Sequence, residues 1–385
     1  MKNRIFFCTS ILQVINTKAA IIKLKKMNGI QYNDYILIIH PLLTKKNKEM
    51  IYKLANKLSY AGVFDFTSLS VNEYEKLNHN IKKNIFSRNI VNYFRNTFKL
   101  YYSLQNKIDT FLKKKIGKID AVFYRGLYSS NKIGSPLDGF YIKAIKDVKN
   151  YYEIEDGAGN YIDFSTWYSD WHQIKHLCKL SIFLFIQTIL SFIINLNFSK
   201  SYNMYFNTSV NNTLIFRNIR YKNAIVIKNE FFEAINLLKL KKIYNKKIKI
   251  IIFGTILNTN FKFNIHDEIT IYENLFEQLV KKYNVNLKEI FYRPHPRCDK
   301  KSFNIYKKKL KCSIFDLNKS DLAEFEFFNK NLLCVVSIGS TALLYAKQLF
   351  NVDSYIIDVK HMKFHPKVSK VSYKTFLKYG IKKIN

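Results

Sequence analysis

Apolar, β-prone runs alternate with stretches of helical periodicity on both sides of a less regular centre. In the first half the expected strands are 5–9, 35–40, 121–125 and 150–155, and in the second half they are 247–253, 289–292, 332–337 and 354–358. The expected helices are 46–59, 90–115, 267–282, 320–329 and 341–349. Because strands that alternate with helices form parallel sheets, the sequence predicts an α/β protein with a parallel sheet in each half.

The length of 385 residues fits two domains. The Lys/Asn-rich stretch 239–249 is the expected hinge, which places the domains at 1–240 and 241–385. The first domain contains an apolar run, 180–196, that polar residues interrupt. This run is short and polar for a membrane span. We therefore expect an apolar helical insert near 165–200 that is buried, forms a dimer contact or lies on a membrane surface.

The chain carries 63 basic and 28 acidic side chains, a formal net charge of +35. This excess favours polyanions, anionic membrane surfaces or phosphorylated substrates as partners. A nucleic-acid-binding protein is one alternative, but the sequence has no RNP-like motif and no zinc-finger spacing, so this alternative rests on charge alone. A membrane-anchored scaffold protein is another.

The cysteine content fits a reducing compartment, because the five cysteines are odd in number and show no CxxC spacing. The beginning of the chain resembles a signal peptide, yet Thr9, Ser10 and Gln13 interrupt its apolar stretch. We therefore expect a strand followed by a helix there, and a cytoplasmic protein.

A pair of carboxylates, Glu155 and Asp156, lies at the end of an expected strand and precedes Gly157. The glycine permits a tight turn that exposes both carboxylates at the sheet edge, where open α/β sheets bind ligands. A carboxylate at this edge could accept a proton from a substrate hydroxyl. An ordinary strand-to-turn junction explains the same residues.

An imidazole follows a strand in the second half, where His295 lies between Pro294 and Pro296. Each proline biases the residue before it toward an extended backbone and so stiffens the loop. Arg293 and Arg297 flank the imidazole, which suits an anionic ligand. A rigid basic surface turn is the alternative interpretation.

A Ser/Thr-rich turn joins another expected strand to the helix 341–349. Ser340 or Thr341 would be the N-cap of that helix. Free N–H groups and hydroxyls at a helix start form an anion site, although a plain N-cap explains the same residues. No Walker pattern and no GxGxxG pattern is present in the sequence.

Three further residues mark the second domain. Gly254 ends a strand and resembles the opening of a nucleotide-binding domain. Glu324 and Glu326 lie near a helix start, where a carboxylate could hold ribose hydroxyls or simply face solvent. The sequence gives little support to a metal site, because the helically spaced pairs His172/His176 and His361/His365 lack a clear third ligand.

The motifs together resemble a known family. Their order is CTSILQ at 8–13, EDG at 155–157, FGT at 253–255, RPHP at 293–296, AE at 323–324 and GSTA at 339–342. This order resembles the bacterial lipooligosaccharide sialyltransferases of glycosyltransferase family 52 and, more distantly, other bacterial sialyl- and polysialyltransferases. The resemblance implies a GT-B architecture, with two Rossmann-like domains facing each other across a cleft. It also implies inverting transfer from CMP-sialic acid, with no metal ion and no other cofactor.

The same resemblance implies residue roles. Asp156 matches the general base, and His295 matches the residue that contacts the leaving phosphate. Ser340 and Thr341 match a phosphate-binding pair, and Glu324 matches an acidic residue on the cytidine ribose. The other donor-side positions are Gly254, Pro296 and Arg293, and the further candidates are Glu155, Gly157, Thr9, Gln13 and Glu326.

Two positions depart from the family pattern. The usual Gly-Gln after the first strand of the second domain is Gly254-Thr255 here, and the usual Thr-Pro-Leu-Gln near the start has an extra residue and no proline. Donor identity and acceptor placement therefore stay open. A related transferase that uses another CMP-linked acid sugar, or a different sugar nucleotide, is the nearest alternative.

The expected partners follow from these assignments. They are a sugar nucleotide donor, a lipooligosaccharide or capsule-type glycan acceptor and an anionic membrane surface, and not a nucleic acid. We expect a peripheral protein at the inner membrane face, and the run 180–196 makes a homodimer plausible.

Overall fold

The structure is a computed structural model. It describes residues 2–8, 10–38, 45–68, 103, 106–125, 148, 150–154, 202–206, 224–238, 247–255, 264–295, 298–316, 323–358 and 376–384. These residues fall into two compact units, one within 2–238 and the other within 247–384.

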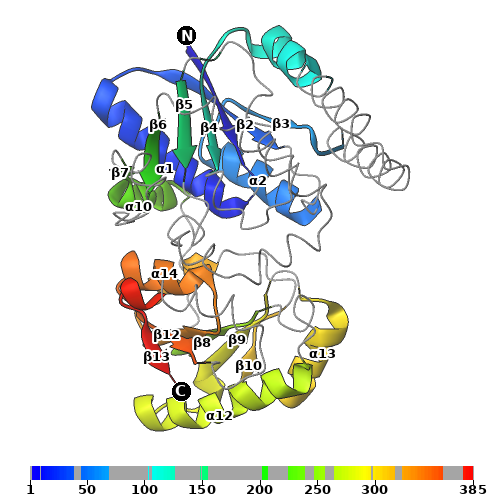
Figure 1. The fold of residues 1–385 in the computed structure, drawn as a ribbon, viewed down its shortest axis with the longest axis vertical. Coiled ribbons are helices and arrows are strands. Elements are labelled where there is room, and N and C mark those ends of the chain that lie inside the picture. The colour runs from blue at the N-terminus through cyan, green and yellow to red at the C-terminus, as the bar shows by residue number, and fades with distance from the viewer. Residues whose placement is uncertain are drawn as a thin grey trace, which may run out of the picture. The chain divides into compact units, whose positions relative to one another are not determined.

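The first unit is built on a seven-stranded sheet in the order β3-β2-β1-β4-β5-β6-β7 (Figure 1). Its strands are β1 Lys2–Phe7, β2 Tyr32–Ile38, β3 Gly62–Asp65, β4 Ile119–Arg125, β5 Asn150–Ile154, β6 Tyr202–Phe206 and β7 Ala224–Val226. Its helices include α1 Ile11–Asn28, α2 Lys45–Lys57 and α10 Lys228–Leu237. All strand pairs are parallel, and the strand order reverses between β1 and β4.

Local sequence defines the ends of α1. The Ser10 side chain accepts a hydrogen bond from the Gln13 backbone N–H at 3.2 Å, which caps the first turn. Gly29 ends the helix with a left-handed φ of 65°, a conformation that costs glycine nothing. Across the sheet, the Phe123 ring stacks on Phe6 at 4.4 Å and on Tyr152 at 4.5 Å between centroids. These contacts tie β1, β4 and β5 into one core.

The second unit is built on a six-stranded parallel sheet in the order β10-β9-β8-β11-β12-β13 (Figure 1). Its strands are β8 Ile250–Phe253, β9 Ile290–Arg293, β10 Ser313–Ile314, β11 Cys334–Ser337, β12 Asp353–Ile357 and β13 Lys382–Ile384. Its helices include α12 Ile265–Tyr283, η2 Leu287–Glu289, α13 Lys300–Lys309, η3 Ala323–Phe328 and α14 Thr341–Gln348. The strand order reverses between β8 and β11, as it does between β1 and β4 in the first unit.

Each expected strand is present in the structure, and no strand end differs from its expected position by more than three residues. One expected helix has a different type, because the pattern at 320–329 gives the short 3-10 helix η3. Three aromatic side chains in six residues pull this segment inward, and Phe327 packs edge-on against both Phe253 and Phe350. The strands β3, β6, β7, β10 and β13 were not predicted, because they are short and their pairing partners are distant in the sequence.

In the described part of the chain, no helix is long and apolar enough to cross a membrane. The apolar run 180–196, the expected insert near 165–200 and residues 239–246 of the expected hinge lie outside the described residues. Their predicted roles stay predictions.

Candidate functional site

Three of the sequence motifs lie at one edge of the second sheet. In register, Phe253 pairs with Arg293 on one side and with Ser337 on the other. The strands β9, β8 and β11 are therefore neighbours, and the residues that follow them leave the sheet at the same carboxyl edge. This edge includes the point between β8 and β11 where the strand order reverses, which is where open α/β sheets bind ligands.

Gly254 forms the close turn that follows β8. Its N–H donates to the Arg293 carbonyl oxygen at 2.9 Å, which extends the pairing of β8 and β9 by one residue. A Cβ atom built on Gly254 would lie 2.7 Å from Cζ of Tyr292 and closer still to the Tyr292 hydroxyl. No side chain fits at residue 254 unless Tyr292 moves.

The turn between β11 and α14 is fixed by two serines. The buried Ser337 hydroxyl donates to the Phe253 carbonyl oxygen at 2.9 Å and accepts from the Gly339 N–H at 3.2 Å. Ser340 is the N-cap of α14, and its side chain accepts from the Ala342 N–H at 3.2 Å. Ser340 and Thr341 are both half-buried at the start of the helix. The arrangement offers backbone N–H groups and hydroxyls to an anion.

Arg293 leaves the end of β9 and meets the acidic turn of η3. Its Nη1 lies 3.6 Å from Oε1 of Glu326, and both side chains are largely buried. Its Cζ lies 5.5 Å from the centroid of the Phe315 ring. Glu324 is also buried, and burial raises the pKa of its carboxyl while the nearby Arg293 charge opposes the rise. The two candidate ribose ligands therefore differ, because Glu326 forms the ion pair with Arg293, whereas burial raises the pKa of Glu324.

His295 is half-buried and lies just beyond β9. Its carbonyl oxygen accepts a hydrogen bond from the Cys298 N–H at 2.8 Å, which closes a turn between the end of β9 and the start of α13. This turn leads into α13, whose N-cap Asp299 accepts from the Ser302 N–H at 2.8 Å. The His295 turn is thus held at both ends, by β9 and by the start of α13.

Among the candidates of the first unit, only Gln13 belongs to the described residues. It is buried in the first turn of α1. Asp156, Glu155, Gly157 and Thr9 lie outside the described residues, as does Pro296 of the second unit. Their roles, and the meeting of Asp156 with His295, stay predictions.

Two residues that shape the site, Tyr292 and Phe315, were not singled out from the sequence. Ser337 belongs to the Ser/Thr-rich turn that the sequence indicates, where it is the polar end of an otherwise apolar strand. In the sequence, Tyr292 has the pattern of an ordinary core residue. The cation–π contact of Phe315 with Arg293 joins two segments that are separated in the sequence. Their importance follows from the order of the strands rather than from a motif.

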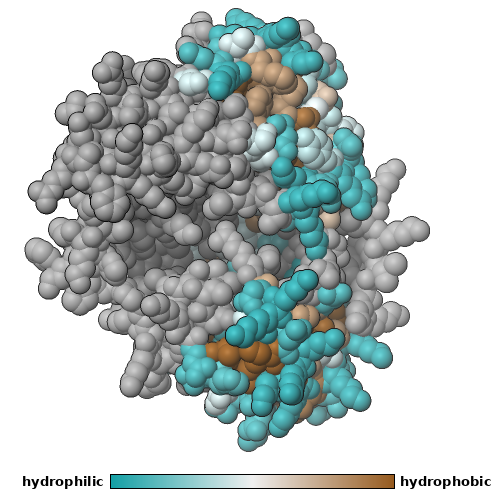
Figure 2. Space-filling view, turned by 90° about the vertical axis from the view of Figure 1, so that its right-hand side faces the viewer, coloured by the Kyte–Doolittle hydropathy of each residue, from teal (hydrophilic) through white to brown (hydrophobic). Residues whose placement is uncertain are grey.

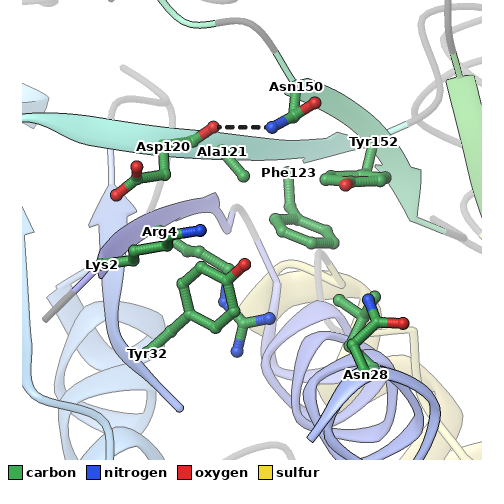
Figure 3. A pocket seen from close by; sticks show the side chains of 10 residues that line it. Lys2, Arg4, Asn28, Tyr32, Asp120, Ala121, Phe123, Asn150 and Tyr152 are labelled. Carbon is green, nitrogen blue, oxygen red and sulfur yellow. Dashed lines mark hydrogen bonds between the residues drawn. The ribbon is translucent and has the colours of Figure 1, made fainter. Parts of the chain in front are cut away.

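A pocket in the first unit lies at the opposite, amino-terminal edge of its sheet (Figure 3). Its lining includes Arg4, Tyr32 and Asn150 from the beginnings of three strands. The Arg4 guanidinium lies 4.1 Å from the Tyr32 ring centroid and is already paired with Asp34, through Nε to Oδ1 at 2.6 Å and Nη2 to Oδ2 at 3.0 Å. Since sheet proteins of this type bind ligands at the carboxyl edge, we do not assign the donor to this pocket.

The two parallel sheets, each with a reversal of strand order at its centre, define an α/β protein of the GT-B class. The sequence identifies the family. The chain belongs to the alpha-2,8-polysialyltransferase (POLYST) family, whose model matches residues 4–359. It is therefore an enzyme of a sialyltransferase family, a glycosyltransferase that transfers sialic acid. Among the motif resemblances, the polysialyltransferase relationship is confirmed, while membership of glycosyltransferase family 52 stays a prediction.

The chain is similar to several solved structures at low sequence identity. The S. aureus MnaA-UDP co-structure has a TM-score of 0.52 and 11% identity, with 100% of this chain and 84% of that chain covered. A sialyltransferase from Photobacterium damsela has a TM-score of 0.49 and 10% identity, with coverage of 100% and 81%. E. coli heptosyltransferase WaaC with ADP-2-deoxy-2-fluoro heptose has a TM-score of 0.39 and 10% identity, with coverage of 93% and 88%. No curated protein matches the sequence.

Proposed function

We propose that the protein is an inverting sialyltransferase that uses CMP-sialic acid and extends a terminal sugar of a lipooligosaccharide or capsule-type glycan. The observation that carries this proposal is the convergence of Gly254, His295 and the Ser340 N-cap at one carboxyl edge, beside Arg293 and two buried glutamates. This edge offers N–H donors, hydroxyls and an imidazole to a phosphate. It also offers a carboxylate to a ribose.

The family name adds detail on the acceptor. An alpha-2,8-polysialyltransferase joins sialic acid units through position 8, so we infer that the acceptor hydroxyl belongs to a terminal sialic acid and that transfer repeats. A polymer of this kind favours a capsule-type glycan over a single capped sugar. The nearest alternative remains transfer of another CMP-linked acid sugar on the same scaffold.

The proposed reaction balances as a single displacement. The acceptor hydroxyl oxygen forms a bond to the anomeric carbon of the donor sugar while the bond from that carbon to the CMP phosphate oxygen breaks. Asp156 accepts the hydroxyl proton, and the transition state resembles an oxocarbenium ion. CMP leaves with the bonding electron pair, and attack from the opposite face inverts the configuration.

The leaving phosphate would meet three groups of the second unit. His295 and the hydroxyls of Ser340 and Thr341 stabilise the charge that develops on the departing oxygen, together with the N–H groups at the start of α14. Arg293 and Pro296 complete the donor side, and Glu324 holds the ribose. With these groups in place, the reaction requires no metal ion in our proposal.

The direct test is CMP release. The purified protein is incubated with CMP-sialic acid and a sialylated oligosaccharide acceptor, with and without EDTA, and free CMP and product length are measured. We expect CMP release that depends on the acceptor, is unchanged by EDTA and gives products longer by several units. Equal release from a panel of other sugar nucleotides, or release abolished by EDTA and restored by a divalent cation, would contradict the proposal.

We also propose that the enzyme works as a peripheral protein at the inner membrane face. Helix α13 and the next residues carry exposed lysines, which are Lys300, Lys301, Lys307, Lys308, Lys309 and Lys311. In Figure 2 the side of the second unit that carries α13 faces the viewer, and hydrophilic side chains cover most of its described surface. Such a cluster attracts anionic lipid headgroups at about 1 kcal/mol per lysine.

A matched pair of variants tests this attachment on liposomes that contain phosphatidylserine. Replacing Lys307, Lys308 and Lys309 by Gln should weaken cosedimentation about 100-fold, from three lysines at about 1 kcal/mol each. The control replaces three exposed lysines of α2, Lys45, Lys53 and Lys57, and changes the net charge equally. Equal weakening in both variants would assign the attraction to total charge and not to α13.

A further inference from the structure

A buried acidic side chain lies in the second unit without a basic partner. Glu268, in the first turns of α12, has no exposed surface. Its Oε1 accepts a hydrogen bond from the Tyr272 hydroxyl at 3.0 Å, and its Oε2 accepts one from the Tyr306 hydroxyl at 2.9 Å. Within the described ranges, no lysine, arginine or histidine forms an ion pair with it. Burial of this side chain without a cation disfavours its charged form.

The two tyrosines that bind Glu268 both pack on Tyr292. The Tyr272 and Tyr292 ring centroids lie 5.2 Å apart, and those of Tyr306 and Tyr292 lie 5.1 Å apart. Tyr272 belongs to α12, Tyr306 to α13 and Tyr292 to β9, so Glu268 ties three elements together. All three rings are fully or almost fully buried. We call Glu268 and these three residues the tyrosine cluster.

The tyrosine cluster reaches the carboxyl edge at two places. The Tyr292 hydroxyl lies against Gly254, where it leaves no room for a Cβ atom. Burial and the Glu268 carboxylate raise the pKa of Tyr272, while the side chain of Thr255, which follows Gly254, has a small opposite effect. The turn that follows β8 therefore rests directly on the cluster.

The second place is the His295 turn. Tyr292 precedes His295 by three residues on the same strand and its extension, and Tyr306 belongs to the helix into which the turn leads. The Cys298 N–H bonds to the His295 carbonyl oxygen at 2.8 Å. Burial raises the pKa of the Cys298 thiol to about 11, and Asp299 and Glu268 both add to the rise. The charge on Glu268 is therefore felt at the turn that carries the imidazole.

We propose that Glu268 is a positioning residue, which acts through the tyrosine cluster to hold the Gly254 turn and the His295 turn in the shape that binds the nucleotide. This inference rests on the proposed function, because it assigns the nucleotide to that edge. Glu268 does not touch the substrate. Its hydrogen bond from Tyr306 joins α12 to α13, while its hydrogen bond from Tyr272 holds the carboxylate against its own helix. The Tyr272 and Tyr306 rings carry this arrangement to Tyr292 of β9, whose hydroxyl lies against Gly254 after β8.

Glu268 positions the Gly254 turn and the His295 turn in its ionised, carboxylate form. In the carboxylate form both oxygens accept a hydrogen bond from a tyrosine hydroxyl, whereas a protonated carboxyl keeps both contacts only by donating one of them, so that one tyrosine hydroxyl becomes the acceptor. Burial raises the pKa of Glu268 to about 7, against the opposing hydrogen bonds from Tyr306 and Tyr272. The titratable groups that face it are Tyr272 on α12, Tyr306 on α13, Tyr292 on β9 and Cys298 before α13. Nucleotide affinity should therefore fall as the pH drops through 7.

The test uses the full chain and CMP as the probe. The Glu268→Gln variant keeps the size of the side chain and offers one acceptor oxygen and one N–H donor group, so it mimics the protonated carboxyl at every pH. The control, Glu277→Gln, removes an exposed carboxylate from the same helix. Calorimetric CMP dissociation constants are measured for each protein at pH 6 and pH 8, and the ratio to wild type at each pH cancels the titration of CMP itself.

We expect Glu268→Gln to bind CMP about tenfold more weakly than wild type at pH 8 and less than about twofold more weakly at pH 6, because a lost hydrogen bond to a charged group has about this effect. The control should match wild type at both pH values. A ratio for Glu268→Gln that is the same at both pH values would overturn the proposal, because a merely structural role would weaken binding equally.

A second measurement separates this inference from the proposed function. Hydrogen exchange, followed by mass spectrometry on peptides that cover 250–255 and 290–298, reports on the two turns without any nucleotide. We expect faster exchange through local opening in both peptides for Glu268→Gln than for wild type at pH 8, although the whole second unit of the variant unfolds less often than that of wild type at this pH. If wild type binds no CMP, the proposed function fails, and the exchange result alone then decides whether Glu268 positions these turns. Unchanged exchange in both peptides would overturn the positioning role.

Discussion

The buried Glu268 makes the stability of the second unit depend on pH in a direction unusual for a carboxylate. Its pKa rises from 4.5 for a free side chain to about 7 in the folded protein. Between these pH values the folded protein holds a proton that the unfolded chain has lost. Rising pH therefore favours unfolding, and stability is full below pH 4.5 and is lost as the pH rises to about 7.

The size of the effect follows from the two pKa values. At about 1.4 kcal/mol per pH unit, the interval from 4.5 to about 7 corresponds to a loss of about 3 kcal/mol in the free energy of unfolding. Glu268→Gln removes the titrating group while keeping its volume. Relative to wild type, the variant should therefore gain about 3 kcal/mol between pH 4 and pH 8.

The free energy of unfolding is measured in urea by hydrogen-exchange mass spectrometry. Only peptides of α12 are used, so that the value belongs to the second unit alone. Wild type, Glu268→Gln and the exposed control Glu277→Gln are compared at each half pH unit from 4 to 8. Taking differences from wild type cancels the other titrating groups of this very basic chain. The reasoning fails if the difference between Glu268→Gln and wild type stays constant across the range, or if the control shows the same trend.

Three further predictions concern the carboxyl edge. Gly254→Ala should destabilise the second unit by about 1 to 3 kcal/mol, because the new methyl group clashes with Tyr292. In a double-mutant denaturation cycle, Tyr292→Phe should recover part of this loss. If the two substitutions are fully additive in their effect on the free energy of unfolding, the contact is contradicted. Asp156→Asn and His295→Ala should each lower kcat roughly 10²- to 10⁴-fold in the CMP-release assay, as loss of an acid–base partner does, and near-normal turnover would remove that residue from its role. Ser340→Ala should cost about 1 kcal/mol of stability through the lost cap and also raise KM for the donor; an unchanged KM would restrict the serine to capping.

Much of the fold was open to prediction from the sequence. Alternation of apolar runs and helical patterns predicted the strands β8, β9 and β11 within three residues, because a buried parallel strand is a nearly continuous apolar run. The short strands β10 and β13 were missed, since two or three residues carry too little pattern. The sequence predicted an α-helix where the 3-10 helix η3 lies, because Phe327 packs on side chains that are distant in the sequence and its position does not follow helix periodicity.

The candidate site shows the same division. Gly254, His295 and Ser340 could be singled out because glycine, proline and helix-capping residues mark the ends of strands, and this signal depends only on neighbouring residues. The pairing of Arg293 with Glu326 could not be predicted, because it joins residues 33 positions apart whose distance depends on the sheet order. The same holds for Glu268, which reads in the sequence as one of several acidic residues on an amphipathic helix.

The sequence by itself determined where strands and helices fall, which turns carry reactive side chains, and the family to which the chain belongs, because these depend on neighbouring residues and on motif order. Only the tertiary structure decided which strand ends lie side by side and which charged side chains are buried away from solvent. Strand order and burial arise from contacts between segments far apart in the chain, and the free energy of an ionised group depends on those contacts. Thus Glu268 of α12 becomes a buried group of the tyrosine cluster, while Glu277 of the same helix stays in solvent.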